Sequence, residues 1–173
     1  MKITLAEAVN LKSIVGKRLI ELQQERTRAA VVKVAKKGDE IEVSERTLDE
    51  ITAELTEART DIRQLGLLLA TANLANTVVW DGVEIPLTVA LELAKQLRGE
   101  VAALKGFGNY KKEEQVSERW SGESFFQVTT FEPKEYKAAA LTLDRQVNKL
   151  SSDLNHKNYT IQVEFPAAVK YIS

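Results

Sequence analysis

The stretch Leu48–Gly82 reads LDEITAELTEARTDIRQLGLLLATANLANTVVWDG and predicts much of the fold. Its apolar residues recur at alternating spacings of three and four, which places them on one stripe of a single long helix. This stripe has the pattern of a coiled-coil seam and consists of Leu48, Ile51, Leu55, Ala58, Ile62, Leu65, Leu69 and Ala72. Thr47 and Glu50 have the spacing of a capping box at the start of this helix.

Three further segments show the same helical period. The first follows the capping-box pair Thr4 and Glu7, and its stripe is Ala8, Leu11, Val15, Leu19 and Leu22. The next follows Pro86, and its stripe is Leu87, Ala90, Ala94, Leu97, Val101 and Leu104. The last follows Pro133, and its stripe is Tyr136, Ala140, Leu143, Val147, Leu150 and Leu154. Four long amphipathic helices need partners for their apolar faces, which favours antiparallel helical hairpins.

Short segments between the helices have the composition of β-strands. TVVW and VEI flank Asp81-Gly82, a dipeptide that readily adopts the backbone angles of a tight hairpin turn. FFQVTTF and TIQVEF are rich in Val, Thr and Phe. We expect these strands to pair with each other, which would give a small sheet at one end of the helices, or to pair across subunits. The predicted fold is therefore mainly α with a small β component.

The two halves of the chain resemble each other. An offset of 82 residues aligns the apolar stripe that begins at Ile3 with the one that begins at Ile85, and it places Asn76 on Asn158. We therefore predict a single domain, 1–173, with a candidate internal duplication into pseudo-repeats 1–82 and 83–173. The alternative is coincidence, because heptad patterns match one another easily.

Composition narrows the function classes. The 24 Lys and Arg residues balance 25 Asp and Glu residues, which argues against binding to duplex nucleic acid. No cysteine is present and the N-terminus lacks the pattern of a secretory signal, so a cytoplasmic location is expected. The uncharged run from Gln64 to Trp80 is shorter than a membrane span and carries Asn73 and Asn76, so no membrane span is predicted.

Asparagines at two helix ends are candidate ligand-binding residues. Asn76 lies four residues beyond Ala72, Asn73 lies four beyond Leu69, and Asn158 lies four beyond Leu154. An amide can donate to and accept from the same ligand, which suits recognition. The alternative is that these residues only end helices, where Asn tolerates the left-handed conformation.

Cations and aromatic residues near the same strands complete the candidate site. The cations that could converge there are Arg63, Lys95, Arg98 and Arg119, of which Arg98 and Arg119 are the candidate ligand-binding residues. Trp80, Trp120 and Tyr159 offer stacking surfaces. Planar Arg donors and aromatic faces suit a nucleotide or another planar anion. Ordinary solvated charge is the alternative for each cation.

The sequence offers little material for catalysis. His156 is the sole histidine, and GFGNYK lacks the ending of a phosphate-binding loop. The acids of ELTEARTDIR recur opposite Arg59 and Arg63 and are interpreted as exposed ion pairs. The connection GFGNYKKEEQVSERWSGES is interpreted as a loop or a lid. We therefore predict no catalytic residue, no metal site and no cofactor.

The chain resembles a family of small bacterial helical proteins, some of which carry the annotation septicolysin. The resembling segments are LAEAVNLKSIVGKRLIELQQ, TANLANT with the following DG, and LDRQVNKLSSDLNHKNYT. The resemblance implies long helical hairpins and self-association, and it transfers no catalytic residue. FFQVTTFEPKEY and the tail PAAVKYIS depart from the family pattern.

These observations favour a non-enzymatic, homo-oligomeric binding protein for a small anionic or nucleotide-like signalling ligand. A structural or protein-interaction scaffold is the main alternative. A membrane-active cytolysin and a metal-dependent hydrolase are further alternatives, although the sequence has no HExxH, paired DxD or GxSxG motif.

Overall fold

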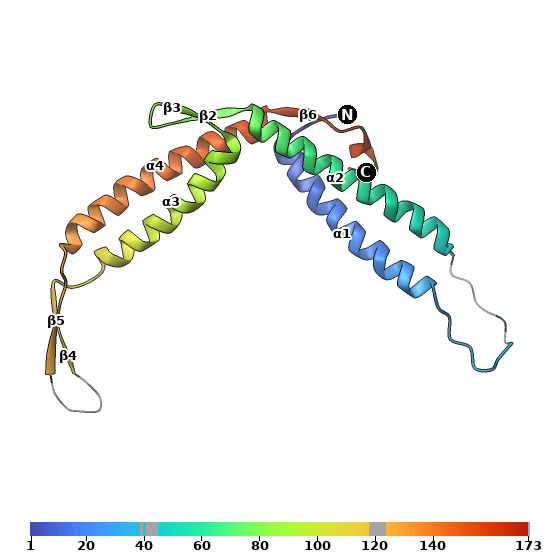
Figure 1. Cartoon of the computed structure of the whole chain (residues 1–173), viewed down its shortest axis with the longest axis horizontal. Coiled ribbons are helices and arrows are strands. Elements are labelled where there is room, and N and C mark those ends of the chain that lie inside the picture. Colours follow the sequence, from blue (N-terminus) through green and yellow to red (C-terminus); the bar gives the residue numbers. More distant parts are fainter. Residues whose placement is uncertain (39, 41–44, 118–123, 173) are drawn as a thin grey trace. The chain divides into compact units, whose positions relative to one another are not determined.

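The computed structural model describes residues 1–38, 40, 45–117 and 124–172. The chain divides into two compact units (Figure 1). The first unit consists of Met1–Ala75 together with Lys157–Ser173, and the second unit is Asn76–His156.

Four long helices run through the described residues, as predicted. They are α1 (Leu5–Ala29), α2 (Leu48–Ala75), α3 (Leu87–Gly108) and α4 (Pro133–Thr160), and a short 3-10 helix, η1 (Pro166–Lys170), follows near the C-terminus. The prediction of a mainly α fold with a small β component is confirmed.

Both predicted capping boxes are present. The backbone N–H of Glu7 donates to Thr4 Oγ1 at 3.2 Å, and the N–H of Thr4 donates to the Glu7 carboxylate at 2.7 Å. At the second box, the N–H of Glu50 donates to Thr47 Oγ1 at 3.2 Å, and the N–H of Thr47 donates to the Glu50 carboxylate at 2.8 Å. The backbone hydrogen bonds from Thr4 and Thr47 lower the pKa of the Glu7 and Glu50 carboxyl groups. Local sequence therefore determines where α1 and α2 begin.

The described strands form three separate antiparallel pairs. These pairs join β1 (Lys2–Thr4) with β6 (Gln162–Glu164), β2 (Thr77–Trp80) with β3 (Val83–Pro86), and β4 (Glu113–Ser117) with β5 (Ser124–Val128). The expectation of a single small sheet was wrong, because the described strands form three separate pairs. Each strand pairs within a hairpin or, for β6, with β1 at the N-terminus. β5 overlaps the predicted strand FFQVTTF, whereas β4 lies in the connection that was expected to be a loop or a lid.

The turn between β2 and β3 has the predicted geometry. Asp81 and Gly82 have φ angles of 49° and 78°, both in the left-handed region. Such angles at both central residues define the turn type whose twist matches that of the flanking strands. The Asp-Gly dipeptide therefore fixes the register of this hairpin, in which Trp80 lies opposite Val83.

The core of the first unit lies between α1 and α2. The predicted stripes are largely buried, with Val15, Leu22, Ile51, Leu55 and Leu65 fully inaccessible to solvent. Two members of the α2 stripe differ: Leu48 is 42% exposed and Ile62 is half-buried, because Leu48 begins the helix and Asp61 occupies a buried place on the same face.

The C-terminal segment closes this core. β6 pairs with β1, and the N–H of Phe165 donates to the Met1 carbonyl at 2.9 Å. The side chains of Phe165 and Ala168 are fully buried. The C-terminal segment is therefore an integral part of the first unit.

In the second unit, α3 and α4 lie side by side (Figure 1). Arg98 on α3 donates to the Ser151 hydroxyl on α4 at 2.7 Å, and Lys105 pairs with Asp144 at 2.9 Å. The rings of Phe107, Phe131 and Tyr136 make edge-to-face contacts at the end of the pair next to β4–β5. Gly108 allows the close approach there, because a Cβ at Gly108 would stand 2.9 Å from the Cα of Lys137.

The order of elements recurs along the chain, as the candidate duplication requires. A strand, two helices and a strand follow one another as β1–α1–α2–β2 and again as β3–α3–α4–β6, with β4–β5 inserted between the second pair of helices. The first unit's N-terminal part ends at Ala75, and its C-terminal part begins at Lys157, which is the position 82 residues later. A common origin of the halves 1–82 and 83–173 stays a prediction.

Candidate functional site

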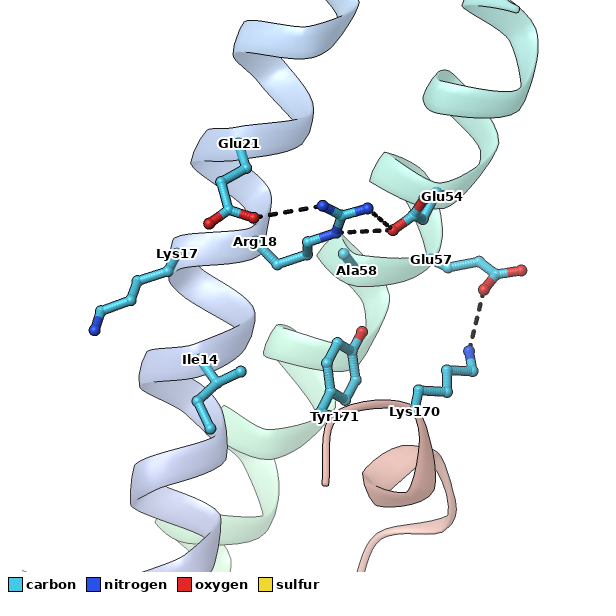
Figure 2. A pocket seen from close by; sticks show the side chains of 9 residues that line it. All are labelled: Ile14, Lys17, Arg18, Glu21, Glu54, Glu57, Ala58, Lys170 and Tyr171. Atoms are coloured by element: carbon cyan, nitrogen blue, oxygen red, sulfur yellow. Dashed lines mark hydrogen bonds and ion pairs between the residues drawn. The ribbon is translucent and has the colours of Figure 1, made fainter. Parts of the chain in front are cut away.

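Among the hollows of the described residues, two of similar size lie one in each unit. The first, of about 390 Å³, lies between α1, α2 and the C-terminal segment of the first unit (Figure 2). The second, of about 410 Å³, lies in the second unit between the β2–β3 turn and α4. Their side chains differ in chemistry.

Arg18 and Glu54 dominate one side of the first hollow. Arg18 reaches from α1 to α2, and its Nε and Nη2 donate to one Glu54 oxygen at 2.9 and 2.7 Å (Figure 2). The other Glu54 oxygen accepts from Arg46, whose Nη1 also donates to Glu25 at 2.9 Å. Partial burial opposes ionisation of Glu54, but the hydrogen bonds from both guanidinium groups outweigh it and lower the pKa of this carboxyl.

The C-terminal segment forms the other side of the first hollow. The Tyr171 hydroxyl donates to Asp61 Oδ2 at 2.7 Å, and Lys170 Nζ lies 3.1 Å from Glu57 and 3.7 Å from Asp61. Burial, followed by the hydrogen bond and the charge of Asp61, raises the pKa of Tyr171 above its ordinary value of 10.0. These contacts fasten the end of the chain to α2.

The prediction of exposed ion pairs along ELTEARTDIR was wrong for Asp61. Its side chain is buried, with the residue 7% exposed, and its hydrogen-bond partner Tyr171 lies 110 positions further along the chain. Glu54 pairs with Arg18 and Arg46 instead of the helix neighbours Arg59 and Arg63. Helical spacing identifies pairs within one helix only, so it misses partners that the tertiary fold supplies.

Most charged groups of the first hollow are already paired with one another. Arg18 is bound to Glu54, Lys170 to Glu57, and the Tyr171 hydroxyl to Asp61. A ligand that entered would have to break these charge-assisted hydrogen bonds. We therefore interpret this hollow as the place where the C-terminal segment is attached to α2, with a structural role.

The second hollow combines one predicted residue with several new ones. Trp80 is half-buried in its wall, next to Asp81 and Gly82 of the turn. Opposite them α4 contributes Gln146, Lys149, Leu150 and Asp153, which follow one another at helical spacing. The pattern around Leu150 places them on one helix face, so the sequence contained a signal for them, but exposed polar residues of a helix are ordinary.

The polar side chains of this Trp80 groove are not engaged elsewhere. Within the described residues, no side-chain hydrogen bond or ion pair involves Gln146, Lys149 or Asp153. The groove therefore presents an aromatic ring, an amide, an ammonium group and carboxylates to solvent. Such a combination can stack on a planar ring and bind its polar edge.

The other predicted site residues are distributed over both units. Asn73, Asn158 and Tyr159 belong to the first unit, while Asn76 and Arg98 belong to the second with Trp80. Tyr159 is 71% exposed, and Arg98 is bound to Ser151 outside the Trp80 groove. The Asn76 carbonyl accepts from the Leu87 N–H at 2.9 Å, which gives its backbone a role at the start of α3.

Arg119 and Trp120 lie outside the described residues. One pocket formed by all eight predicted residues therefore stays a prediction.

Two classes of feature are absent from the part of the chain that the structure describes. No cluster of three or more His, Cys, Asp or Glu side chains there is arranged to hold a metal ion. No helix in the same residues combines the length and the apolar character needed to cross a membrane.

Comparisons with known proteins inform the fold alone. No family model matches the chain, and no curated protein matches it. The chain is similar to the crystal structure of a functionally unknown conserved protein from Corynebacterium diphtheriae, with a TM-score of 0.64 and 20% identity over 95% of this chain and 100% of that chain. The resemblance to the septicolysin-annotated family stays a prediction.

Proposed function

We propose that this chain is a cytoplasmic, self-associating binding protein that holds a small nucleotide-like ligand in the Trp80 groove without chemical conversion. The observation that carries the proposal is the half-buried Trp80 ring beside a set of polar side chains, Gln146, Lys149 and Asp153, that have no hydrogen-bond partner within the described residues. Small-ligand sites combine apolar walls with a few convergent polar groups in this way.

Each part of a nucleotide has a matching group in the groove. A base can stack on Trp80, because every nucleobase has a flat aromatic face that a Trp ring can cover. Gln146 can both donate to and accept from a base edge, and the Asp153 carboxylate accepts from an amino or imino group. Lys149 supplies the positive charge for a phosphate.

The balance of charge limits the ligand class. The groove has the carboxylates of Asp81 and Asp153 but only the single ammonium group of Lys149. A triphosphate would place several negative charges near two carboxylates, which is unfavourable. We therefore expect preference for a ligand with one phosphate, or with phosphate charges partly removed by esterification, over a nucleoside triphosphate.

Isothermal titration with nucleosides, nucleoside monophosphates and nucleoside triphosphates tests the proposal. The substitution Trp80→Leu should weaken binding by about 1–3 kcal/mol, through lost stacking. Lys149→Ala should weaken monophosphate binding by less than about 1 kcal/mol and leave nucleoside binding nearly unchanged. Lys134→Ala is a matched control, because Lys134 is exposed on the same helix outside the groove.

The proposal fails if no member of the panel binds at millimolar concentration. It also fails if Trp80→Leu binds as tightly as the parent protein, provided that circular dichroism shows equal helix content. Mass spectrometry of the denatured purified protein adds an independent measurement, since a retained small molecule of this class would be detected directly.

A further inference from the structure

The β4–β5 hairpin exposes apolar side chains on both faces. In its register Glu113 lies opposite Val128 and Gln115 opposite Phe126, so Phe126 and Val128 share one face. Val116 lies opposite Phe125 on the other face. Phe126 is 64% exposed and Val128 57% exposed, although both are large apolar residues. Figure 1 shows this hairpin projecting from the ends of α3 and α4.

The hairpin is incomplete as a sheet. Among the described strands, β4 and β5 pair only with each other. An isolated two-stranded hairpin is marginally stable in water, and it becomes stable when further strands or a packed layer are added. Each strand of the hairpin also has an outer edge whose backbone groups can pair with a further strand.

The two edges of the hairpin differ in charge. β4 begins with Glu113 and Glu114, directly after Lys111 and Lys112, and charged side chains are a common protection of a sheet edge. β5 carries no charged residue, and neither does the chain from residue 124 to residue 131. An uncharged apolar edge without proline is the edge on which a further strand is expected to pair.

A second copy of β5 fits this edge. If two copies pair antiparallel about an axis at Phe126, Phe126 lies opposite Phe126 of the second copy, and Phe125 lies opposite Gln127 of the second copy. The apolar face with Phe126 and Val128 then continues across the junction, and no charge meets a like charge. A two-fold contact requires a self-complementary surface, and a short uncharged strand centred on an aromatic residue has this property.

We propose that two copies of this chain associate by antiparallel pairing of β5 with β5 of the second copy, which creates a four-stranded sheet centred on Phe126. This inference rests on the self-association included in the proposed function, and it assigns that self-association to the edge of β5. The Trp80 groove is lined by no residue of β4 or β5. Ligand binding and association can therefore be measured separately, and either can fail alone.

Sedimentation equilibrium over a wide range of protein concentration tests the pairing. The parent protein should change from the chain mass of 19.3 kDa toward twice that mass as concentration rises. Phe126→Lys should lose this change, because like charges would lie directly opposite each other at the axis. Val116→Lys is the matched control: it introduces the same charge on β4, away from the pairing edge, and should retain association.

A charge-swap experiment tests the register. Phe126→Lys and Phe126→Glu should each remain at the monomer mass, whereas an equal mixture of the two should regain the doubled mass, since opposite charges would then meet at the axis. The proposal is overturned if the parent protein stays monomeric at all concentrations, if Phe126→Lys still dimerises, or if the mixture stays monomeric. Unchanged circular dichroism and ligand titration of both variants separate lost association from lost folding.

Discussion

Removal of one oxygen from Tyr171 should loosen the attachment of the C-terminal segment to α2. In Tyr171→Phe the buried Asp61 carboxylate loses the hydroxyl that donates to it at 2.7 Å and, among the described residues, keeps Lys170 Nζ at 3.7 Å. A hydrogen bond to a charged group contributes about 1.5–3 kcal/mol. Since Tyr171 is only half-buried, we expect a loss of about 2 kcal/mol in the free energy of unfolding of the first unit.

The loss can be measured in two ways. For a chain of this length, each kcal/mol lowers the melting temperature by about 2–4 °C, so a decrease of about 4–8 °C is expected. Urea unfolding followed by circular dichroism gives the free energy, and hydrogen exchange should show faster exchange in residues 165–172. Tyr159→Phe is the matched control, because Tyr159 is 71% exposed and its change should cost less than about 0.5 kcal/mol. Equal stability of the two variants would refute this account of Asp61.

The burial of Tyr171, together with its hydrogen bond to Asp61, gives the stability an alkaline dependence. The raised pKa of Tyr171 means that its contribution is fully present below the ordinary value of 10.0 and is lost as pH rises through the folded-state pKa. The parent protein should therefore lose stability above pH 10 more steeply than Tyr171→Phe. Parallel curves for the two proteins would contradict this origin of the shift.

Two further substitutions test the same unit. Phe165→Ala should cost about 3–5 kcal/mol, since its ring is fully buried, whereas Val169→Ala, at a position 66% exposed in the same segment, should be nearly neutral in urea unfolding. Glu54→Gln should cost less than about 1 kcal/mol, because the pair with Arg18 is more than a third exposed. The lowered pKa of Glu54 means that its contribution is present above the ordinary value of 4.5 and is lost as pH falls through the folded-state pKa, so Glu54→Gln should be less sensitive to acid than the parent protein.

The helices could be predicted because their signals are local. Each seam is a period within one segment, and the capping boxes Thr4–Glu7 and Thr47–Glu50 mark two helix starts within four residues. The Asp81-Gly82 turn is equally local, since two adjacent residues supply both positive φ angles. These elements depend on no distant partner.

The pairing of the remaining strands could not be predicted in the same way. FFQVTTF and TIQVEF were expected to form strands, and β5 and β6 overlap them, but no local signal indicates that β6 pairs with β1 and β5 with β4. β4 has the sequence EEQVS, whose two glutamates suggest a solvated loop until β5 is placed beside it. Strand formation here depends on cross-strand neighbours more than on intrinsic propensity.

The residues of the candidate site also differ in whether a local sequence signal identifies them. Trp80 could be predicted because it directly precedes a recognisable turn. Its companions on α4 could not, because Gln146, Lys149 and Asp153 have the ordinary composition of an exposed helix face until the hairpin lies against them. Asp61 was predicted to be exposed for a related reason, because its hydrogen-bond partner Tyr171 lies 110 positions further along the chain.

A paired experiment should distinguish the roles of the two hollows. Their volumes are similar, about 390 and 410 Å³, but their charged side chains differ in whether they are already paired. Arg18 and Lys170 already bind carboxylates, so the first hollow contributes to stability, whereas Lys149 is uncommitted within the described residues and can bind a ligand. Tyr171→Phe should lower the stability of the first unit and leave ligand affinity unchanged. Lys149→Ala should weaken phosphate binding and leave unfolding unchanged, since loss of a solvated lysine without a partner costs little. If Tyr171→Phe weakened ligand binding as much as Lys149→Ala, the assignment of a structural role to one hollow and a binding role to the other would be wrong.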